Sequence, residues 1–188
     1  MKVLVTGVGG QLGYDVMQEL QRRGIDCCGA DRAEFDITDF AATHKFIIDY
    51  MPDAVIHCSA YTAVDKAEDE PELCKAVNAG GTENIAKVCK EIGAKMIYIS
   101  TDYVFPGTGE NFYEPDDATA PCNVYGETKL AGELAVKKLL DKYFIVRISW
   151  VFGINGNNFI KTMLKLGETH EELKVVADQI GSPTYTAD

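Results

Sequence analysis

Strand-sized apolar runs alternate with longer helical patterns along the whole chain, and this alternation restricts the fold more than any other feature. The runs read Val-Leu-Val, Ala-Val-Ile, Met-Ile-Tyr-Ile and Phe-Ile-Val, which is the composition of strands buried on both faces. Helices in the intervening segments would cover those faces. The pattern predicts an α/β fold built on a doubly wound parallel sheet. Strands are expected at residues 2–6, 25–30, 53–57, 95–99, 143–148 and 173–177, and helices at 11–23, 38–50, 71–91, 124–141 and 157–167.

Two long connections interrupt this regular pattern, at residues 58–70 and 103–122. The second contains three prolines and two glycines, one of them Gly109, and is therefore not expected to hide a helix. Loops of this length are usually functional or disordered. Both follow the carboxyl ends of expected strands, where open α/β sheets bind their ligands.

Length and charge limit the classes of function. With 188 residues, the chain is expected to form one domain with a sizeable core. Its net charge of −11 opposes the phosphate neutralisation that nucleic-acid binding requires. No apolar stretch is long enough to span a membrane, and the first residues do not resemble a signal peptide. We therefore expect a cytoplasmic protein that binds neither nucleic acid nor membrane.

The six cysteines and three histidines show neither the spacing of a disulfide framework nor that of a metal site. Reduced thiols and no bound metal are expected. The last residues read GSPTYTAD, and the final Asp188 is a good helix N-cap with no helix after it. We therefore expect residues 1–188 to be a fragment that lacks a C-terminal portion.

A glycine-rich turn lies between the first expected strand and the first expected helix. Gly7, Gly10 and Gly13 are spaced at three residues. The first would permit the tight turn, the second the approach of a diphosphate to the backbone, and the third close packing of helix on strand. N–H groups at the start of the helix, around Gln11 and Leu12, would then hold the anion. Placed within a strand–helix–strand unit, the turn predicts a dinucleotide site of the Rossmann type.

Asp31 ends the second expected strand, at the distance from the glycines where a carboxylate meets the adenosine ribose hydroxyls. The neighbouring Arg32 is suited instead to neutralising a 2′-phosphate. The two residues favour different cofactors, so NADH and NADPH both stay open.

Tyr125 and Lys129 begin the helix after the second long connection, and their spacing places them on one helix face. An ammonium group near a phenol lowers the phenol pKa. Such a pair could donate a proton to the oxygen of a carbonyl that is being reduced. A surface pair without function has the same spacing.

Four segments in this order resemble the extended short-chain dehydrogenase/reductase family: TGVGGQLG at 6–13, VNAGGTEN at 77–84, STDYVF at 100–105 and YGETK at 125–129. The resemblance implies a nicotinamide cofactor and a catalytic set of hydroxyl, tyrosine and lysine. The hydroxyl at the matching position is Thr101.

Further segments resemble the dTDP-4-dehydrorhamnose reductase family: AYTAVDKAE at 60–68, YGETKLAGE at 125–133, RISWVFG at 147–153 and DQIGSPTYTAD at 178–188. That resemblance implies reduction of the 4-keto group of a dTDP-linked deoxy sugar with NADPH or NADH, in a possible homodimer. It also implies that Val64, Asp102, Tyr103 and Trp150 line the sugar site, that Asp36 and Ile37 flank the adenine, and that Ala60 and Tyr61 flank the nicotinamide ribose.

Two positions depart from the family pattern, and two other functions stay open. Ser59 stands where a second alanine is expected, and Pro106 where an aspartate is expected, which leaves fine specificity in doubt. A related epimerase or dehydratase is one alternative, although Tyr103 replaces the second acid that elimination would need. The other is a non-catalytic nucleotide-binding protein similar to the regulatory subunit of methionine adenosyltransferase.

Overall fold

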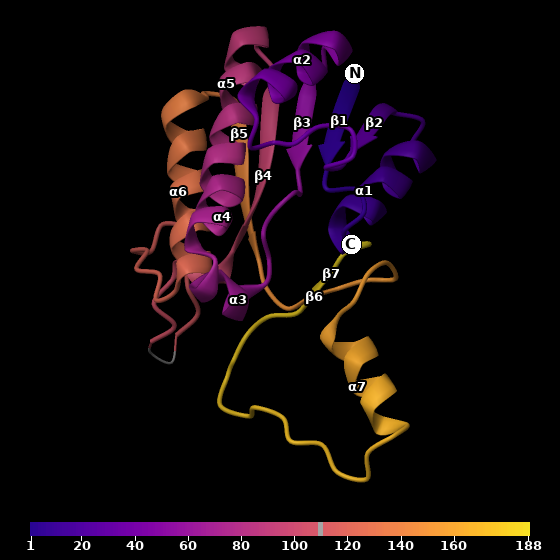
Figure 1. Cartoon of the computed structure of the whole chain (residues 1–188), viewed down its shortest axis with the longest axis vertical. Coiled ribbons are helices and arrows are strands. Elements are labelled where there is room, and N and C mark those ends of the chain that lie inside the picture. The colour runs from indigo at the N-terminus through magenta and orange to yellow at the C-terminus, as the bar shows by residue number, and fades with distance from the viewer. Residues whose placement is uncertain (109–110) are drawn as a thin grey trace.

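A five-stranded parallel sheet organises the chain in the computed structural model, which describes residues 1–108 and 111–188 (Figure 1). The order is β2-β1-β3-β4-β5, which confirms the predicted doubly wound sheet. The order reverses at β1, which pairs with β2 on one side and with β3 on the other. The carboxyl ends of β1 and β3 therefore open a crevice between them. The strands are β1 (Lys2–Thr6), β2 (Asp26–Ala30), β3 (Ala54–His57), β4 (Lys95–Thr101) and β5 (Tyr143–Ile148).

Three of the helices stand together along one face of the sheet in Figure 1, namely α2, α5 and α6. The side chains between them and the strands form the main core, which includes Leu4, Ile47, Ile85 and Met96. Helix α1 packs against β1 and β2. The helices are α1 (Gln11–Arg22), α2 (Phe40–Tyr50), α3 (Val64–Asp69), α4 (Pro71–Lys75), α5 (Thr82–Ile92), α6 (Val124–Leu139) and α7 (Phe159–Gly167).

The expected strand at 173–177 is wrong. This stretch is irregular and crosses open space below the sheet in Figure 1, with Val175 and Val176 half or more exposed. An apolar β-rich run becomes a strand only where a partner edge satisfies its backbone, and no described strand lies beside this one. Two short strands elsewhere pair in parallel instead, β6 (Val151–Phe152) and β7 (Thr184–Tyr185).

The structure also differs in detail from the sequence expectation at two connections and one helix. The connection at 58–70 contains α3, so only its first part is loop. The expected helix at 71–91 consists of α4, a π-helical turn at Ala76–Gly81 and α5. In the connection at 103–122, the chain makes one 3₁₀ turn at Asp102–Val104, and positions 109–110, including Gly109, lie outside the described residues.

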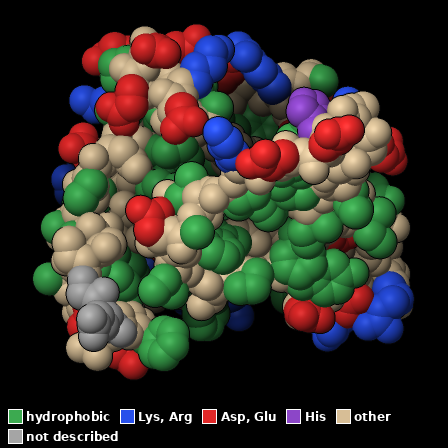
Figure 2. Space-filling model, turned by 90° about the horizontal axis from the view of Figure 1, so that it is seen from below, with side chains coloured by type: hydrophobic (Ala, Val, Ile, Leu, Met, Phe, Trp, Pro, Cys, Tyr) green, Lys and Arg blue, Asp and Glu red, His purple; other side chains and the backbone are tan. Residues whose placement is uncertain are grey.

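Hydrophobic side chains gather on the face seen in Figure 2, the underside of Figure 1. In the C-terminal segment, residues 150–188, the large exposed ones include Ile154, Phe159, Ile160, Leu164, Val176 and Ile180. Among the described helices, none is both long enough and apolar enough to cross a membrane.

Candidate active site

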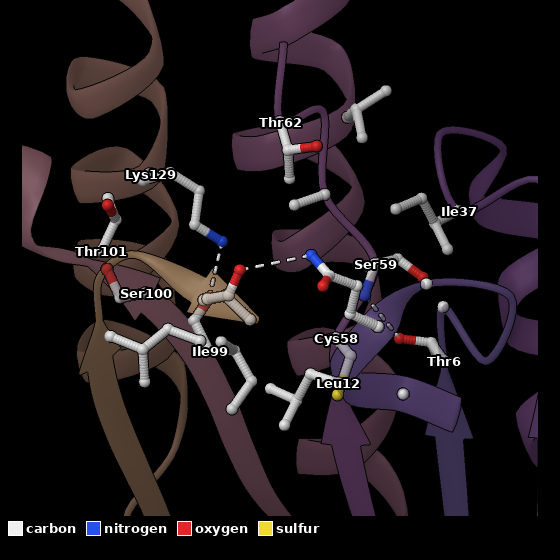
Figure 3. A pocket seen from close by; sticks show the side chains of 18 of the residues that line it. Thr6, Leu12, Ile37, Cys58, Ser59, Thr62, Ile99, Ser100, Thr101 and Lys129 are labelled. Atoms are coloured by element: carbon white, nitrogen blue, oxygen red, sulfur yellow. Dashed lines mark hydrogen bonds between the residues drawn. The ribbon is translucent and has the colours of Figure 1, made fainter. Parts of the chain in front are cut away.

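A cleft of about 570 Å³ opens at the carboxyl ends of β1, β3 and β4, on the crevice that the sheet order predicts (Figure 3). This volume is in the range of ligand sites. In Figure 3, Thr6, Cys58 and Ser59 line one side of the cleft, and Thr101 and Lys129 line the opposite side. The two long connections that the sequence singled out therefore meet at one site.

The glycine turn leads directly into α1 and leaves the start of that helix uncapped. Gly10 is the N-cap in extended backbone, and no side chain caps the first N–H groups. A Cβ on Gly13 would overlap the carbonyl of Gly7, so the third glycine is required by close packing. The turn, Gln11 and Leu12 all line the cleft. Uncapped N–H groups facing a cleft are suited to a diphosphate.

The end of β2 supplies a carboxylate beside this turn. Asp31 Oδ2 accepts a hydrogen bond from the Gly9 N–H at 2.5 Å. The Arg32 side chain is largely exposed, with its Nε 3.5 Å from Asp36 Oδ2. The Asp36 carboxylate accepts hydrogen bonds from both the hydroxyl and the N–H of Thr38, and these lower the Asp36 pKa despite partial burial. All three charged residues line the cleft, as does Ile37.

Thr101, the last residue of β4, lies on the opposite side of the cleft and is buried. Its hydroxyl donates to Asp102 Oδ1 at 3.1 Å and accepts from the Tyr103 N–H at 3.2 Å. Burial raises the pKa of the Asp102 carboxyl, although the Thr101 hydroxyl acts against it. Helix α6 packs directly on this turn, because a Cβ on Gly126 would overlap the Tyr103 carbonyl. A glycine next to Tyr125 thus lets the tyrosine approach Thr101.

Burial dominates the chemistry of Tyr125. It raises the pKa of the phenol to about 12, and the Thr101 hydroxyl beside it acts in the opposite direction. The expectation that Lys129 lowers this pKa is not met, because burial and the nearby Asp102 carboxylate both raise it. A phenol with a raised pKa stays protonated at neutral pH and is available as a proton donor.

The Lys129 ammonium is almost completely buried below the cleft. Its Nζ donates to the Ile99 carbonyl at 2.6 Å (Figure 3). The same Nζ lies 4.2 Å from the centre of the Tyr98 ring. Burial lowers the pKa of Lys129 to about 7, while the Glu133 carboxylate acts to raise it. The charged form of this lysine therefore depends on its neighbours.

Two buried polar side chains brace the site from behind. His57 lies between the hydroxyls of Thr6 and Thr82, at 2.7 and 3.1 Å from its ring nitrogens, and burial lowers its pKa to about 3. Asn78 accepts from the Tyr61 N–H at 2.8 Å and donates to the Tyr61 carbonyl at 3.1 Å. Both are structural residues. In the described part of the chain, no three His, Cys, Asp or Glu side chains gather as a metal site would require.

The cleft brings together all but one of the residues that the sequence analysis predicts to act in catalysis or to bind the cofactor or the substrate. The exception is Tyr61, which is not among the lining residues because its hydroxyl donates to Glu70 at 2.8 Å. Its neighbours Ala60 and Thr62 line the cleft. Val64, Asp102, Tyr103 and Trp150, which are expected to line the sugar site, also line the cleft. The lining residues that sequence reasoning missed include Phe35, Cys58, Thr62, Val77 and Ser149. Ser59, which the sequence analysis named only as a departure from the family pattern, also lines the cleft.

The only sequence signal for these missed residues is their location after the carboxyl ends of strands. Cys58 and Thr62 lie in a connection after a strand, and Ser149 directly follows β5. That location marks a region of the site but does not say which side chains turn inward.

The fold and the site together define a Rossmann-type protein of the extended short-chain dehydrogenase/reductase class. The order of the sheet, the uncapped glycine turn and the meeting of Thr101, Tyr125 and Lys129 in one cleft all support this class. The chain belongs to the family described as RmlD substrate binding domain, whose model matches residues 1–188.

Relatives with known names agree with this family. The chain is 45% identical over 186 residues to a dTDP-4-dehydrorhamnose reductase of Streptomyces griseus, covering 98% of this chain and 61% of the relative. It is 45% identical, with a TM-score of 0.97, to the crystal structure of a dTDP-4-dehydrorhamnose reductase from Clostridium acetobutylicum, covering 100% of this chain and 66% of that one. The enzyme of that name from Bacillus anthracis, solved in complex with NADP, is 48% identical with a TM-score of 0.96, covering 99% and 66%. The chain thus spans about 60% of the length of the curated relatives it matches.

Proposed function

We propose that this chain carries the cofactor site and the catalytic residues of a dTDP-4-dehydrorhamnose reductase, which reduces the 4-keto group of dTDP-4-dehydrorhamnose to give dTDP-L-rhamnose. The observation that carries the proposal is the convergence of Thr101, Tyr125 and Lys129 opposite the glycine turn in one cleft. The relatives named as this reductase support the choice of substrate.

The residues of the cleft fit a nicotinamide dinucleotide. The uncapped start of α1 would hold the diphosphate, and Asp31 the adenosine ribose. Asp36 and Ile37 would flank the adenine, and Ala60 would lie at the nicotinamide ribose. When bound, NADPH or NADH supplies the hydride for the reduction.

The chain's own residues supply the proton and stabilise the charge that develops on the sugar oxygen. Tyr125 is protonated at neutral pH and would donate to that oxygen, with the Thr101 hydroxyl as a second hydrogen-bond partner. Lys129 would place a positive charge behind them. Trp150 and Tyr103 are about half exposed in the cleft and offer aromatic faces to the sugar.

The test is a rate measurement on the full-length protein with NADPH and dTDP-4-dehydrorhamnose. We expect NADPH absorbance to fall only when the keto-sugar nucleotide is present, and dTDP-L-rhamnose to accumulate. Tight binding of NADPH without turnover would contradict the proposal and favour a nucleotide-binding regulatory protein.

Arg32 is expected to select for NADPH. Its side chain is largely exposed and makes only a long contact with Asp36, so it is free to turn toward a 2′-phosphate. Replacing Arg32 by Ala should weaken NADPH binding by about tenfold or more and leave NADH binding unchanged, since a hydrogen bond to a charged group contributes about 1.5–3 kcal/mol. Titration calorimetry with both cofactors measures this, with Arg22→Ala on the exposed end of α1 as the matched control. Equal losses for both cofactors would show that Arg32 does not contact the phosphate.

A cytoplasmic location and a homodimer belong to the same proposal. All six cysteines are free thiols, which supports a reducing compartment. Sedimentation of the full-length protein would test the dimer.

A further inference from the structure

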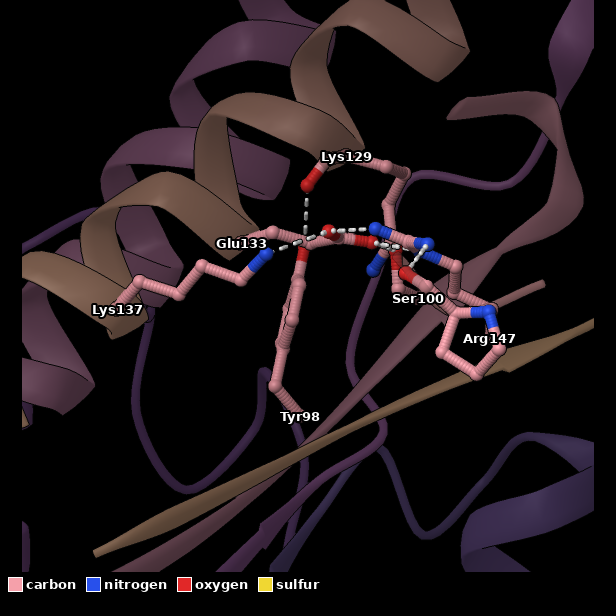
Figure 4. A network of polar contacts seen from close by, with 7 residues as sticks. Tyr98, Ser100, Lys129, Glu133, Lys137 and Arg147 are labelled. Carbon is pink, nitrogen blue, oxygen red and sulfur yellow. Dashed lines mark hydrogen bonds and ion pairs between the residues drawn. The ribbon is translucent and has the colours of Figure 1, made fainter. Parts of the chain in front are cut away.

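An ion pair is buried directly behind the catalytic residues (Figure 4). Glu133 of α6 is completely buried, and its two carboxylate oxygens accept hydrogen bonds from Arg147 Nε at 2.9 Å and Nη2 at 2.7 Å. The Ser100 hydroxyl donates to the same carboxylate at 2.6 Å. Burial acts to raise the pKa of Glu133, but the hydrogen bonds from Arg147 and Ser100 outweigh it and lower that pKa. The carboxylate is therefore charged at neutral pH.

The pair is linked to both sides of the catalytic set. Ser100 immediately precedes Thr101 on β4, and Glu133 lies one turn after Lys129 on the same helix. The backbone carbonyl of Lys129 also accepts from the buried Tyr98 hydroxyl at 3.3 Å. A shift of Glu133 would therefore move the helix turn that carries Lys129 relative to the strand end that carries Thr101.

Arg147 extends the same network to the long connection that follows β4. Its Nη1 donates to the Pro115 carbonyl at 3.0 Å, and its guanidinium carbon lies 4.8 Å from the centre of the Phe105 ring. Phe105 directly follows the turn that holds Tyr103. One guanidinium group thus joins β5, α6 and the segment that borders the proposed sugar site.

We propose that Glu133 and Arg147 are positioning residues for the reductase reaction: their buried ion pair sets Thr101 and Lys129 relative to each other and holds Phe105 and Pro115 through Arg147. The proposal rests on the function proposed above. Stability alone is a weak reason for such a pair, because apolar side chains of similar volume often replace a buried ion pair without loss. What the pair supplies is a set of directed contacts among three elements at the site.

The Glu133 carboxylate also acts electrostatically on the Lys129 ammonium, one turn earlier on α6. Apart from Glu133, the titratable groups around Lys129 are Tyr125 on α6, Tyr98 on β4, His57 and Cys58 at the end of β3, and Cys74 on α4. Compared with these groups, the Glu133 carboxylate has the largest effect in raising the Lys129 pKa against burial. Without the carboxylate, the Lys129 pKa should fall, so activity that needs the ammonium should be lost at lower pH on the alkaline side.

The experiment compares three variants of the full-length protein with the parent. Glu133→Gln removes only the negative charge and leaves Arg147 buried without its partner. Glu133→Leu/Arg147→Met removes both charges. The double variant is therefore expected to fold even if the unpaired buried charge prevents Glu133→Gln from folding. Lys137→Ser is the matched control. The Lys137 side chain is half exposed, and its Nζ lies 3.9 Å from the same carboxylate. The measurements are kcat, KM for the keto-sugar, NADPH affinity and the pH dependence of kcat/KM.

The double variant is expected to lose kcat by about tenfold or more, because displacement of a reacting group by about 1 Å can cost about 10²-fold. The alkaline limit of its kcat/KM should move to lower pH, while NADPH affinity and the Lys137→Ser control stay near the parent. A folded double variant with the parental kcat and pH profile would overturn the proposal. A smaller yield of folded enzyme with an unchanged pH dependence of kcat/KM would also overturn the proposal, because a purely structural role gives that result.

A failure of the proposed function would be recognised separately, since the parent itself would then not oxidise NADPH with the keto-sugar. In that case the pair is tested without turnover, by NMR titration of labelled lysine side chains. Lys129 should titrate at lower pH in the double variant than in the parent. An identical titration in both proteins would overturn the proposal.

Discussion

Replacing Tyr125 by Phe is expected to lower kcat by about 10²-fold or more, the scale of a lost general acid. Burial raises the pKa of the phenol to about 12, so the phenol is protonated at neutral pH and would be the proton donor of the proposed catalytic set. The ring would still pack edge-on against Tyr103, whose ring centre lies 5.6 Å away, so cofactor affinity should change little. Steady-state rates with the keto-sugar, together with separately measured NADPH affinity, test this.

Two variants make the result specific. Thr101→Val should lose less activity than Tyr125→Phe, because one neutral hydrogen bond contributes only about 0.5–1.5 kcal/mol. Tyr143→Phe removes a hydroxyl at the amino end of β5, away from the cleft, and should keep the parental rate. Near-normal kcat in Tyr125→Phe would contradict the assignment of the general acid and would favour a binding protein over a reductase.

Replacing Gly10 by Val should weaken NADPH and NADH binding by about 10²-fold or more, since hydrogen bonds to a charged group contribute about 1.5–3 kcal/mol each and more than one would be lost. A Cβ at Gly10 would meet only the Gly7 carbonyl, at 3.3 Å, so the protein should stay folded. Gly13 is a poorer choice, because a Cβ there would overlap backbone and disturb the packing of α1.

Calorimetry with each cofactor measures the effect, and thermal unfolding by circular dichroism checks the fold. Gly167→Val is the control, because nothing lies within 4 Å of a Cβ at that position at the end of α7. Undiminished affinity in Gly10→Val would show that the diphosphate does not bind at the glycine turn.

Local sequence patterns were sufficient for most of the fold. The five strands of the sheet and the start of α1 depend on apolar runs and on glycine spacing, both of which act between residues close in the chain. The same is true of Tyr125 and Lys129, whose shared helix face follows from a spacing of four. The alternation of strands and helices then implied that the carboxyl-end loops would meet.

Only the tertiary structure decided which neighbours a loop side chain contacts and whether an apolar run finds a partner strand. Tyr61 turns to Glu70 while Thr62 lines the cleft, and no pattern in the loop distinguishes the two. The run at 173–177 has the composition of a strand, but it has no strand edge beside it.

The pKa values of the site depend on the tertiary structure in the same way. The spacing of Tyr125 and Lys129 suggested a lowered phenol pKa, yet burial raises it. Glu133 and Arg147 lie 14 residues apart and meet only because α6 packs on β4 and β5. Periodicity and turn chemistry are local properties that the sequence alone determined, whereas burial and charge pairing depend on which faces pack together.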